Sequence, residues 1–217
     1  MPACSIRMRF AELDAVTVDG YGTLLELDNP ETRLQQALAL SGVGRDVAAV
    51  GHAFETEASY YRARAHLGRD ERTLAKLRQD CVGVFLSTLE AALEPAAFVE
   101  DFVAALEFNV VCGAAHMLGL LRARGLRLAV VANWDCSLPQ QLARLGLDGL
   151  FDTVVTSAEA GAPKPSPEPF ALALRRLHTN PDRALHVGDE PADEQGAQAA
   201  GMRFAPAPLA RAFEGWE

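Results

Sequence analysis

The stretch AVTVDGYGTL, Ala15 to Leu24, decides the fold of this chain. It opens with an apolar run typical of a buried strand and continues into a carboxylate, Asp19, and a turn that contains Gly20 and Gly22. Open α/β sheets bind ligands at the carboxyl ends of their strands, and glycines let backbone amides approach a substrate. We therefore predict that Asp19 is a nucleophile that forms a covalent aspartyl intermediate. The residues alone also fit a strand that leads into an ordinary turn, with Asp19 capping the next element.

Three further segments place polar residues after apolar runs or inside loops. After the apolar run at 126–131 the chain reads ANWD, with Asn133 at its second position. A proline-rich loop, GAPKPSPEPF at 161–170, contains Lys164. The apolar run at 184–187 continues into Gly188 and Asp189, and Asp193 follows before a helix-like segment. We expect these segments to meet Asp19 at one edge of a sheet.

The four segments resemble, in order and context, motifs I to IV of the haloacid dehalogenase superfamily, and the resemblance covers nearly the whole chain. It implies an α/β fold with a Rossmann-like parallel sheet core, residues 1–26 and 109–217, and an inserted α-helical bundle cap, residues 27–108. The activity it implies is hydrolysis by an aspartate nucleophile, with water later cleaving the covalent intermediate. A cap above the strand ends would exclude water and select substrates.

The resemblance also implies roles for single residues. Lys164 would assist catalysis by neutralising the crowded carboxylates and the charge of the substrate, although a solvated loop lysine is the alternative. Mg²⁺ would be held by carboxylates and one backbone carbonyl, those of Asp19, Asp189, Asp193 and Tyr21. Whether Asp193 or Glu194 faces the ion is open, because both could instead begin a helix at its positive end. The residues implied to bind substrate are Gly20, Tyr21, Gly22, Thr23, Ala132 and Asn133.

Two residues depart from the pattern of the family's phosphatases. Tyr21 stands where these enzymes usually carry a second aspartate, which protonates the departing alkoxide, and a phenol with a pKa of about 10 does this less readily. A halide leaves without a proton, and the family's dehalogenases usually have tyrosine at this position. Ala132 replaces a hydroxyl residue and so removes a hydrogen-bond donor, for which Asn133 and backbone amides could compensate. Gly188-Asp189, in contrast, resembles the metal-using branches.

Residues 30 to 108 lack strand signals and read as a helical insertion. Asn29 and Pro30 form a start signal for a first helix, and a second helix is expected from near Val47 toward His66. A stripe of apolar residues that includes Leu74 predicts a third helix, and Pro95 opens a fourth. After the insertion, apolar runs alternate with helix-like segments, which predicts a parallel sheet covered on both faces.

The composition favours a soluble globular protein. A net charge of −9 opposes binding to nucleic acid or to anionic membranes, and no apolar segment is long enough to span a bilayer. The first ten residues lack the apolar core of a signal peptide. Cys4, Cys81, Cys112 and Cys136 show no paired spacing, which indicates reduced thiols and a cytoplasmic location. The five histidines are scattered, and His186 reads as strand filler.

Three hypotheses of function follow. The first is a Mg²⁺-dependent phosphatase of a small phosphorylated metabolite, either slow or limited to an easily expelled leaving group. The second is a carbon-halogen hydrolase similar to 2-haloacid dehalogenases, which would need a halide-binding arginine from the insertion, with Arg33, Arg62, Arg64 and Arg69 as candidates. The third is a binding or regulatory protein of reduced activity. Substrate identity and oligomeric state stay open.

Overall fold

A five-stranded parallel sheet forms the centre of residues 10–216, the part of the chain that the computed structural model describes. The strand order is β5-β4-β1-β6-β7. The strands are β1 (Ala15–Val18), β4 (Arg127–Ala132), β5 (Thr153–Thr156), β6 (Ala184–Gly188) and β7 (Arg203–Pro206). Every residue of β1 and β6 is buried, as expected for strands covered on both faces.

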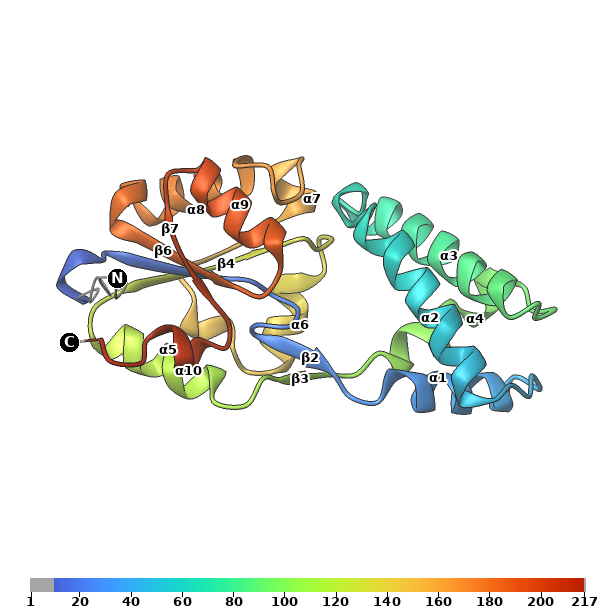
Figure 1. The fold of residues 1–217 in the computed structure, drawn as a ribbon. Helices are drawn as coiled ribbons and strands as arrows, with labels where there is room; N and C mark the ends of the chain where they lie inside the picture. Colours follow the sequence, from blue (N-terminus) through green and yellow to red (C-terminus); the bar gives the residue numbers. More distant parts are fainter. Residues whose placement is uncertain (1–9, 217) are drawn as a thin grey trace, which may run out of the picture.

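Helices cover both faces of this sheet (Figure 1). One face carries α7 (Ser157–Ala160), α8 (Glu168–Leu177) and α9 (Pro191–Ala199), and the other α5 (Ala114–Ala123), α6 (Leu138–Arg144) and α10 (Leu209–Ala212). Each face has its own apolar core: Val16 and Val18 point to one, while Ala15 points to the other. Short 3-10 turns η1 (Phe10–Glu12), η3 (Asp148–Leu150) and η4 (Pro181–Arg183) complete this part. The predicted α/β fold is confirmed.

Between β1 and β4 the chain forms a helical insertion that packs as a bundle beside the sheet (Figure 1). It consists of α1 (Pro30–Leu40), α2 (Val47–Arg62), η2 (Ala65–Leu67), α3 (Glu71–Thr88) and α4 (Pro95–Ala105). Its core contains a cluster of three aromatic rings, Phe85, Phe98 and Phe102, with ring centroids 5.0 to 6.5 Å apart. An antiparallel ribbon of β2 (Leu25–Leu27) and β3 (Phe108–Val110) joins it to the sheet.

Two local expectations differ from the structure. Asn29 does not cap α1 with its side chain; its backbone is in the left-handed region, and its amide donates to Asp28 at 2.7 Å instead. The second helix ends at Arg62 rather than near His66, and η2 follows it. This early end lets η2 turn back and pack against α7.

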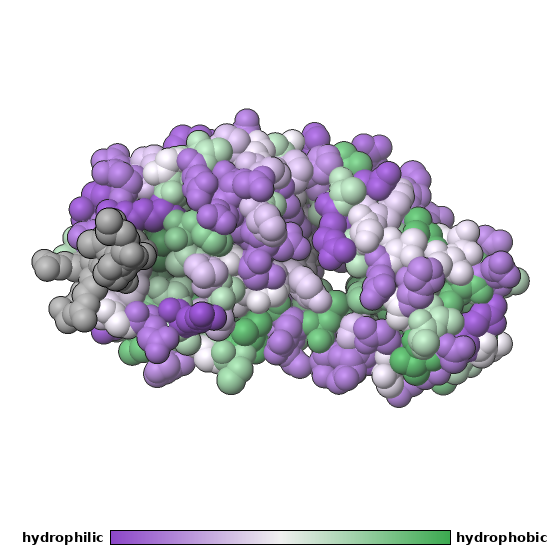
Figure 2. Space-filling model, in the orientation of Figure 1, coloured by the Kyte–Doolittle hydropathy of each residue, from purple (hydrophilic) through white to green (hydrophobic). Residues whose placement is uncertain are grey.

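The insertion touches the sheet domain through η2 and the end of α2. The hydroxyl of Tyr61 donates to Asp135 Oδ2 at 2.8 Å, and the backbone N–H of Cys136 donates to the carbonyl of Gly68 at 2.8 Å. A Cβ at Gly68 would lie 2.8 Å from the Cβ of Asp135, so the approach requires a glycine there. Figure 2 shows an opening between the two parts of the molecule.

The cysteines that the structure describes are not joined in disulfides. Cys81, Cys112 and Cys136 are free thiols, while Cys4 lies outside the described residues. Within residues 10–216, no helix combines the length and the apolar character that crossing a bilayer requires.

Candidate active site

The carboxyl ends of three strands and one loop bring the four sequence segments together. Asp19 follows β1, Asn133 follows β4, Asp189 follows β6, and Lys164 lies in the loop between α7 and α8. Asp193 is in the first turn of α9. Because all the strands run in the same direction, these residues meet at one edge of the sheet.

Lys164 is the centre of the site. Its ammonium group donates to Asp19 Oδ1, to Asp193 Oδ1 at 2.5 Å and to the carbonyl of Val131 at 3.1 Å. All three side chains are at least nine-tenths buried: Asp19 and Lys164 are each 6% exposed and Asp193 is 1% exposed. The three N–H donors of the lysine are therefore all used inside the protein, and a solvated loop lysine is ruled out.

The loop that carries Lys164 is fixed from two sides. The side chain of Asn133 accepts from the backbone N–H of Lys164 at 2.7 Å and donates to its carbonyl at 3.1 Å. On the other side, a Cβ at Gly196 would lie 3.2 Å from the carbonyl oxygen of Pro165 and would also collide with Phe170. Asn133 and Gly196 thus hold the backbone so that the lysine reaches Asp19.

Asp193 accepts hydrogen bonds on both of its oxygens. Oδ1 receives Lys164 and the Nε2 of His186, the latter at 3.1 Å, and Oδ2 receives the backbone N–H of Glu190 at 3.1 Å. Glu194 is exposed and accepts from Gln198. Of the two acidic residues at the start of α9, Asp193 therefore faces the site and Glu194 faces solvent.

The charges of this cluster depend on one another. Burial raises the pKa of Asp19 to about 7, although the charge of Lys164 opposes the rise. Burial would also raise the pKa of Asp193, but the hydrogen bond from His186 and the charge of Lys164 outweigh it and lower the pKa to about 2. Burial disfavours the charged form of Lys164, yet the two carboxylates hold its pKa above the usual value. Lys164 and Asp193 are thus charged at neutral pH, and Asp19 is near its midpoint.

Asp189 completes an acidic group at the mouth of the site. It is exposed, and its Oδ1 accepts from the buried hydroxyl of Thr23 at 3.1 Å. A Cβ at Gly22 would fall 2.7 Å from the carboxyl carbon of Asp189, so the carboxylate lies directly against the motif I backbone. One oxygen each of Asp19, Asp189 and Asp193 lie within 4.8 Å of one another. Asp193 already accepts three hydrogen bonds from the protein, so Asp19 and Asp189 have more oxygen lone pairs left for a cation, with Asp193 as the third carboxylate of the group.

The remaining residues of the expected substrate site line the turn after β1. Gly20 lies against β4, where an added Cβ would be 3.0 Å from that of Ala132 and 3.5 Å from the ring of Trp134. Ala132 is buried, whereas Tyr21 is 48% exposed and lies at the surface beside Asp189. Burial, together with the nearby acidic side chains, raises the pKa of the Tyr21 phenol, so it remains protonated at neutral pH.

His186 is the member of this cluster that sequence reasoning missed. It lies on β6 in register with Thr17 of β1, and its ring is fully buried between Thr17 and Asp193. The alternation of side chains along β6 could have indicated this role. His186 and Ala184 point to the same buried face of the sheet, toward α8 and α9. A polar side chain on that face needs a buried partner.

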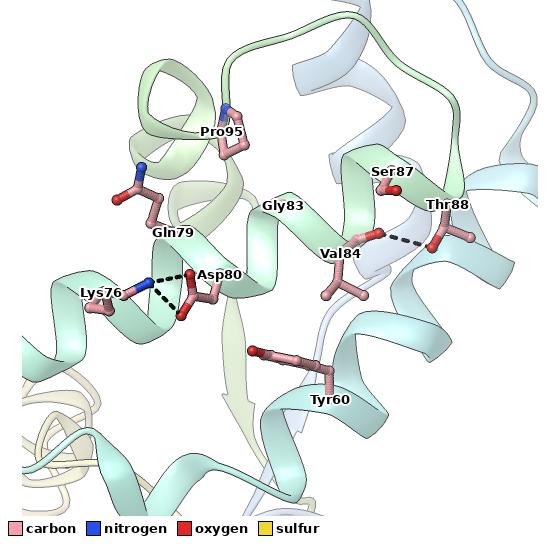
Figure 3. Close-up of a pocket in the computed structure, with 9 residues that line it drawn as sticks. All are labelled: Tyr60, Lys76, Gln79, Asp80, Gly83, Val84, Ser87, Thr88 and Pro95. Carbon is pink, nitrogen blue, oxygen red and sulfur yellow. Dashed lines mark hydrogen bonds and ion pairs between the residues drawn. The ribbon is translucent and has the colours of Figure 1, made fainter.

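A groove elsewhere on the molecule does not belong to this site. It measures about 640 Å³ and lies in the insertion, between α2, α3 and the start of α4 (Figure 3). Its lining includes Tyr60, Lys76 and Asp80 and contains no residue of the four sequence segments. The chemistry of the groove is that of an ordinary helix surface.

Comparison with known proteins agrees with this arrangement. The sequence profile of the haloacid dehalogenase-like hydrolases matches residues 13–201. Haloacid dehalogenase-like hydrolase domain-containing protein 3 of Mus musculus is 37% identical over 206 residues, which cover 88% of this chain and 80% of that protein. A phosphoglycolate phosphatase of Aquifex aeolicus is 38% identical over 91 residues, covering 42% of this chain and 43% of that protein.

Among solved structures, the L-2-haloacid dehalogenase of Xanthobacter autotrophicus has the same fold. Its structure with covalently bound chloropropionic acid aligns with a TM-score of 0.69 at 24% identity, covering 90% of this chain and 77% of that one. The profile match spans most of the chain and includes all four segments that meet around Lys164. This chain therefore belongs to the haloacid dehalogenase-like hydrolases.

Proposed function

We propose that this hydrolase is a Mg²⁺-dependent phosphatase of small phosphorylated molecules, with Asp19 as its nucleophile. The observation that carries the proposal is the buried ammonium of Lys164, which joins Asp19 and Asp193 beside the carboxylate of Asp189. The similarity to the phosphoglycolate phosphatase of Aquifex aeolicus supports the phosphate ester as substrate. The net charge of −9 favours a small-molecule substrate over nucleic acid or a membrane surface.

The proposed reaction has two chemical steps. A carboxylate oxygen of Asp19 attacks the phosphorus, the bond to the leaving oxygen breaks, and an aspartyl phosphate forms. Water then attacks this acyl phosphate, which releases inorganic phosphate and restores the carboxylate. Lys164 stabilises the negative charge that gathers beside Asp19 in both steps. Asn133 contributes by fixing the backbone of Lys164.

The charge balance of the site fits a divalent cation. Three carboxylates, Asp19, Asp189 and Asp193, face a single ammonium group, which leaves an excess of negative charge before a phosphate arrives. Hard oxygen ligands at this spacing suit Mg²⁺, and we propose that Asp19, Asp189 and the carbonyl of Tyr21 hold it next to Asp193. When bound, the ion would neutralise the phosphate and favour the ionised form of Asp19.

Tyr21 limits which esters the site can cleave. Its phenol is a weak acid and stays protonated. Burial and nearby acidic side chains, Asp189 among them, raise its pKa further. An alkoxide leaving group would therefore receive a proton slowly, whereas a phenolate or another stabilised anion needs none. We expect much faster turnover of aryl phosphates than of alkyl phosphates.

A second candidate, carbon-halogen hydrolysis of 2-haloacids, is favoured by Tyr21 and by the structural likeness to the L-2-haloacid dehalogenase. The arginines available for a halide differ in their contacts. Arg33 is paired with Asp28 and Glu107, and Arg64 stacks on Tyr60 with 3.9 Å to the ring centroid. Arg62 is exposed, and its charge acts on Tyr21. Of these three arginines, Arg62 is thus the best halide-binding candidate of this alternative.

A paired substrate screen tests the proposal. Release of phosphate from aryl and alkyl esters and of chloride from 2-chloropropionate is measured with Mg²⁺ and with a chelator, for the parent and for Asp19→Asn. We expect Mg²⁺-dependent phosphate release that falls at least about 1,000-fold in Asp19→Asn, because the amide is not a nucleophile. Chloride release that persists in chelator would establish the second candidate. Ligand binding without any turnover would instead show a protein of reduced activity.

A further inference from the structure

The buried imidazole of His186 has a polar partner at each ring nitrogen. Nδ1 lies 2.8 Å from Thr17 Oγ1 and Nε2 lies 3.1 Å from Asp193 Oδ1. The ring of Phe170 stands edge-on to it, with 4.9 Å between centroids and an interplanar angle of 87°. With Thr17 on β1, Phe170 on α8 and Asp193 on α9, three elements confine the ring.

The partners determine how the ring carries its proton. Asp193 is an anion and can only accept, so Nε2 must carry a hydrogen and donate. Full burial and the nearby charge of Lys164 disfavour a second proton, which leaves Nδ1 as an acceptor for the hydroxyl of Thr17. A directed series of hydrogen bonds then runs from Thr17 through His186 to Asp193, which in turn accepts from Lys164.

His186 and Lys164 donate to the same oxygen of Asp193. Asp193 Oδ1 receives both His186 and Lys164, while Oδ2 is held by the backbone N–H of Glu190. The direction from which Oδ1 meets the ammonium is therefore set by His186 on one side and by the start of α9 on the other. The same ammonium also donates to Asp19 Oδ1, so its position between the two carboxylates depends on where Asp193 is held.

We propose that His186 is a positioning residue for Lys164, acting through Asp193, and that it keeps the ammonium centred on the nucleophile Asp19. The proposal rests on the phosphatase function proposed above for its kinetic consequence, but its structural consequence does not. Loss of the Nε2 donor lets Asp193 rotate and draw Lys164 away from Asp19. Turnover then falls, while substrate binding, which depends on the outer part of the site, changes little.

The experiment compares three variants with the parent. His186→Leu removes the donor, and His186→Gln keeps an N–H donor at about the reach of Nε2. Leu185→Ala is the matched control, because Leu185 is fully buried on the same strand but points to the opposite core. Should His186→Leu not fold, His186→Asn takes its place, since its shorter amide can bond Thr17 but does not reach Asp193.

Two readouts are taken. The first is kcat and KM for an aryl phosphate with Mg²⁺. The second is the side-chain ammonium signal of Lys164 by NMR after selective ¹⁵N-lysine labelling. The chain contains two lysines, and Lys76 has an exposed side chain on α3, so the buried Lys164 can be assigned directly.

We expect His186→Leu to lower kcat by about 10- to 100-fold with KM within about twofold, and to shift the Lys164 signal. His186→Gln should restore most of kcat and the parental signal, and Leu185→Ala should lower the melting temperature while leaving kcat and the signal unchanged. Equal kcat in His186→Leu and Leu185→Ala with an unmoved signal would overturn the proposal.

The role of His186 can be tested even if the proposed phosphatase function is wrong. If the parent cleaves no phosphate ester, the phosphatase proposal fails, and the NMR comparison alone decides the role of His186. A signal that moves in His186→Leu and returns in His186→Gln then supports positioning, and a signal that stays in place in both excludes it.

Discussion

The two lysines of the chain lie in the two parts of the molecule and in opposite surroundings. Lys164 in the sheet domain is buried and donates to Asp19, Asp193 and a backbone carbonyl. Lys76 in the insertion has a side chain that is 73% exposed and pairs with Asp80 one helical turn away, at 2.7 Å (Figure 3). Both form ion pairs, but only the pair in the sheet domain has been removed from water, and a buried charge depends on its partners.

A similar contrast holds for buried acidic residues. Asp193 accepts from Lys164, His186 and a backbone N–H, and its pKa is low. Glu57 on α2 is 5% exposed, but its side-chain partner is the thiol of Cys81, a weak donor, and burial raises its pKa to about 7. Asp193 is thus stabilised as an anion by several donors, whereas Glu57 lacks such donors and its neutral form is favoured by burial. The comparison indicates that the site is organised in the sheet domain.

The largest expected effect comes from removing the charge of Lys164. In Lys164→Met, Asp19 and Asp193 lose their shared cation while remaining buried, so we expect a loss of about 3 to 5 kcal/mol in the free energy of unfolding at neutral pH. Phosphatase turnover should fall by about 100-fold or more, since the charge that stabilises the transition state is gone. Denaturant unfolding and steady-state kinetics measure the two effects.

Lys76→Met is the control for this change, because it makes the same substitution at the exposed ion pair. We expect its unfolding curve and its kinetics to follow those of the parent closely. If Lys76→Met destabilised the protein as much as Lys164→Met, burial would not explain the difference between the two lysines, and the comparison of the two parts would be wrong.

A smaller effect, visible only as a function of pH, is expected at Glu57. Its pKa in the folded protein, about 7, is above the ordinary value of 4.5, so the stability it contributes is present below about pH 4.5 and is lost as the pH rises through 7. Glu57→Gln is neutral at every pH. Relative to the parent, this variant should therefore gain about 2 to 3 kcal/mol in unfolding free energy between about pH 5 and pH 8.

Urea unfolding of parent and variant at a series of pH values measures this difference, and subtraction removes the contributions of groups that both proteins share. Asp46→Asn is a poor control, because Asp46 caps α2 and accepts from the backbone of Ala49. The exposed Glu55 on the same helix is suitable, as Glu55→Gln changes the same group in water. Parallel pH curves for Glu57→Gln and the parent would show that Glu57 is ionised when folded.

The sheet and the positions of Asp19, Lys164 and Asp189 could be anticipated from the sequence because they follow local rules. Buried parallel strands read as apolar runs, and a polar residue immediately after such a run lies at the carboxyl edge of the sheet. Lys164 needed the resemblance in addition, since a lysine among prolines carries no structural signal of its own. Its three acceptors come from residues 29 to 145 positions away and are visible only in the fold.

Side-chain contacts between distant elements could not be predicted from the sequence, because local patterns do not determine them. His186 is an ordinary strand residue until the register places it beside Thr17 and the turn of α9 brings Asp193 to its other nitrogen. Tyr61 belongs to the helical stripe of α2, and nothing near it in the sequence points to Asp135, 74 positions later. Such contacts arise from how the insertion sits on the sheet domain, which periodicity does not encode.

The smallest expected effect tests this contact between the two parts. Tyr61→Phe removes a hydroxyl that donates to Asp135 Oδ2 at 2.8 Å, leaving that oxygen short of one donor, and should lower the unfolding free energy by about 1 to 2 kcal/mol. Tyr60→Phe deletes the same atom one residue earlier, on the side of α2 that lines the groove in Figure 3. If the contact holds the insertion against the sheet domain, Tyr61→Phe should also raise the rate of proteolytic cleavage near η2, while Tyr60→Phe should not. Equal cleavage rates in the two variants would mean that Gly68 and the β2–β3 ribbon hold the insertion in place without the tyrosine, since the glycine already packs its backbone against Asp135.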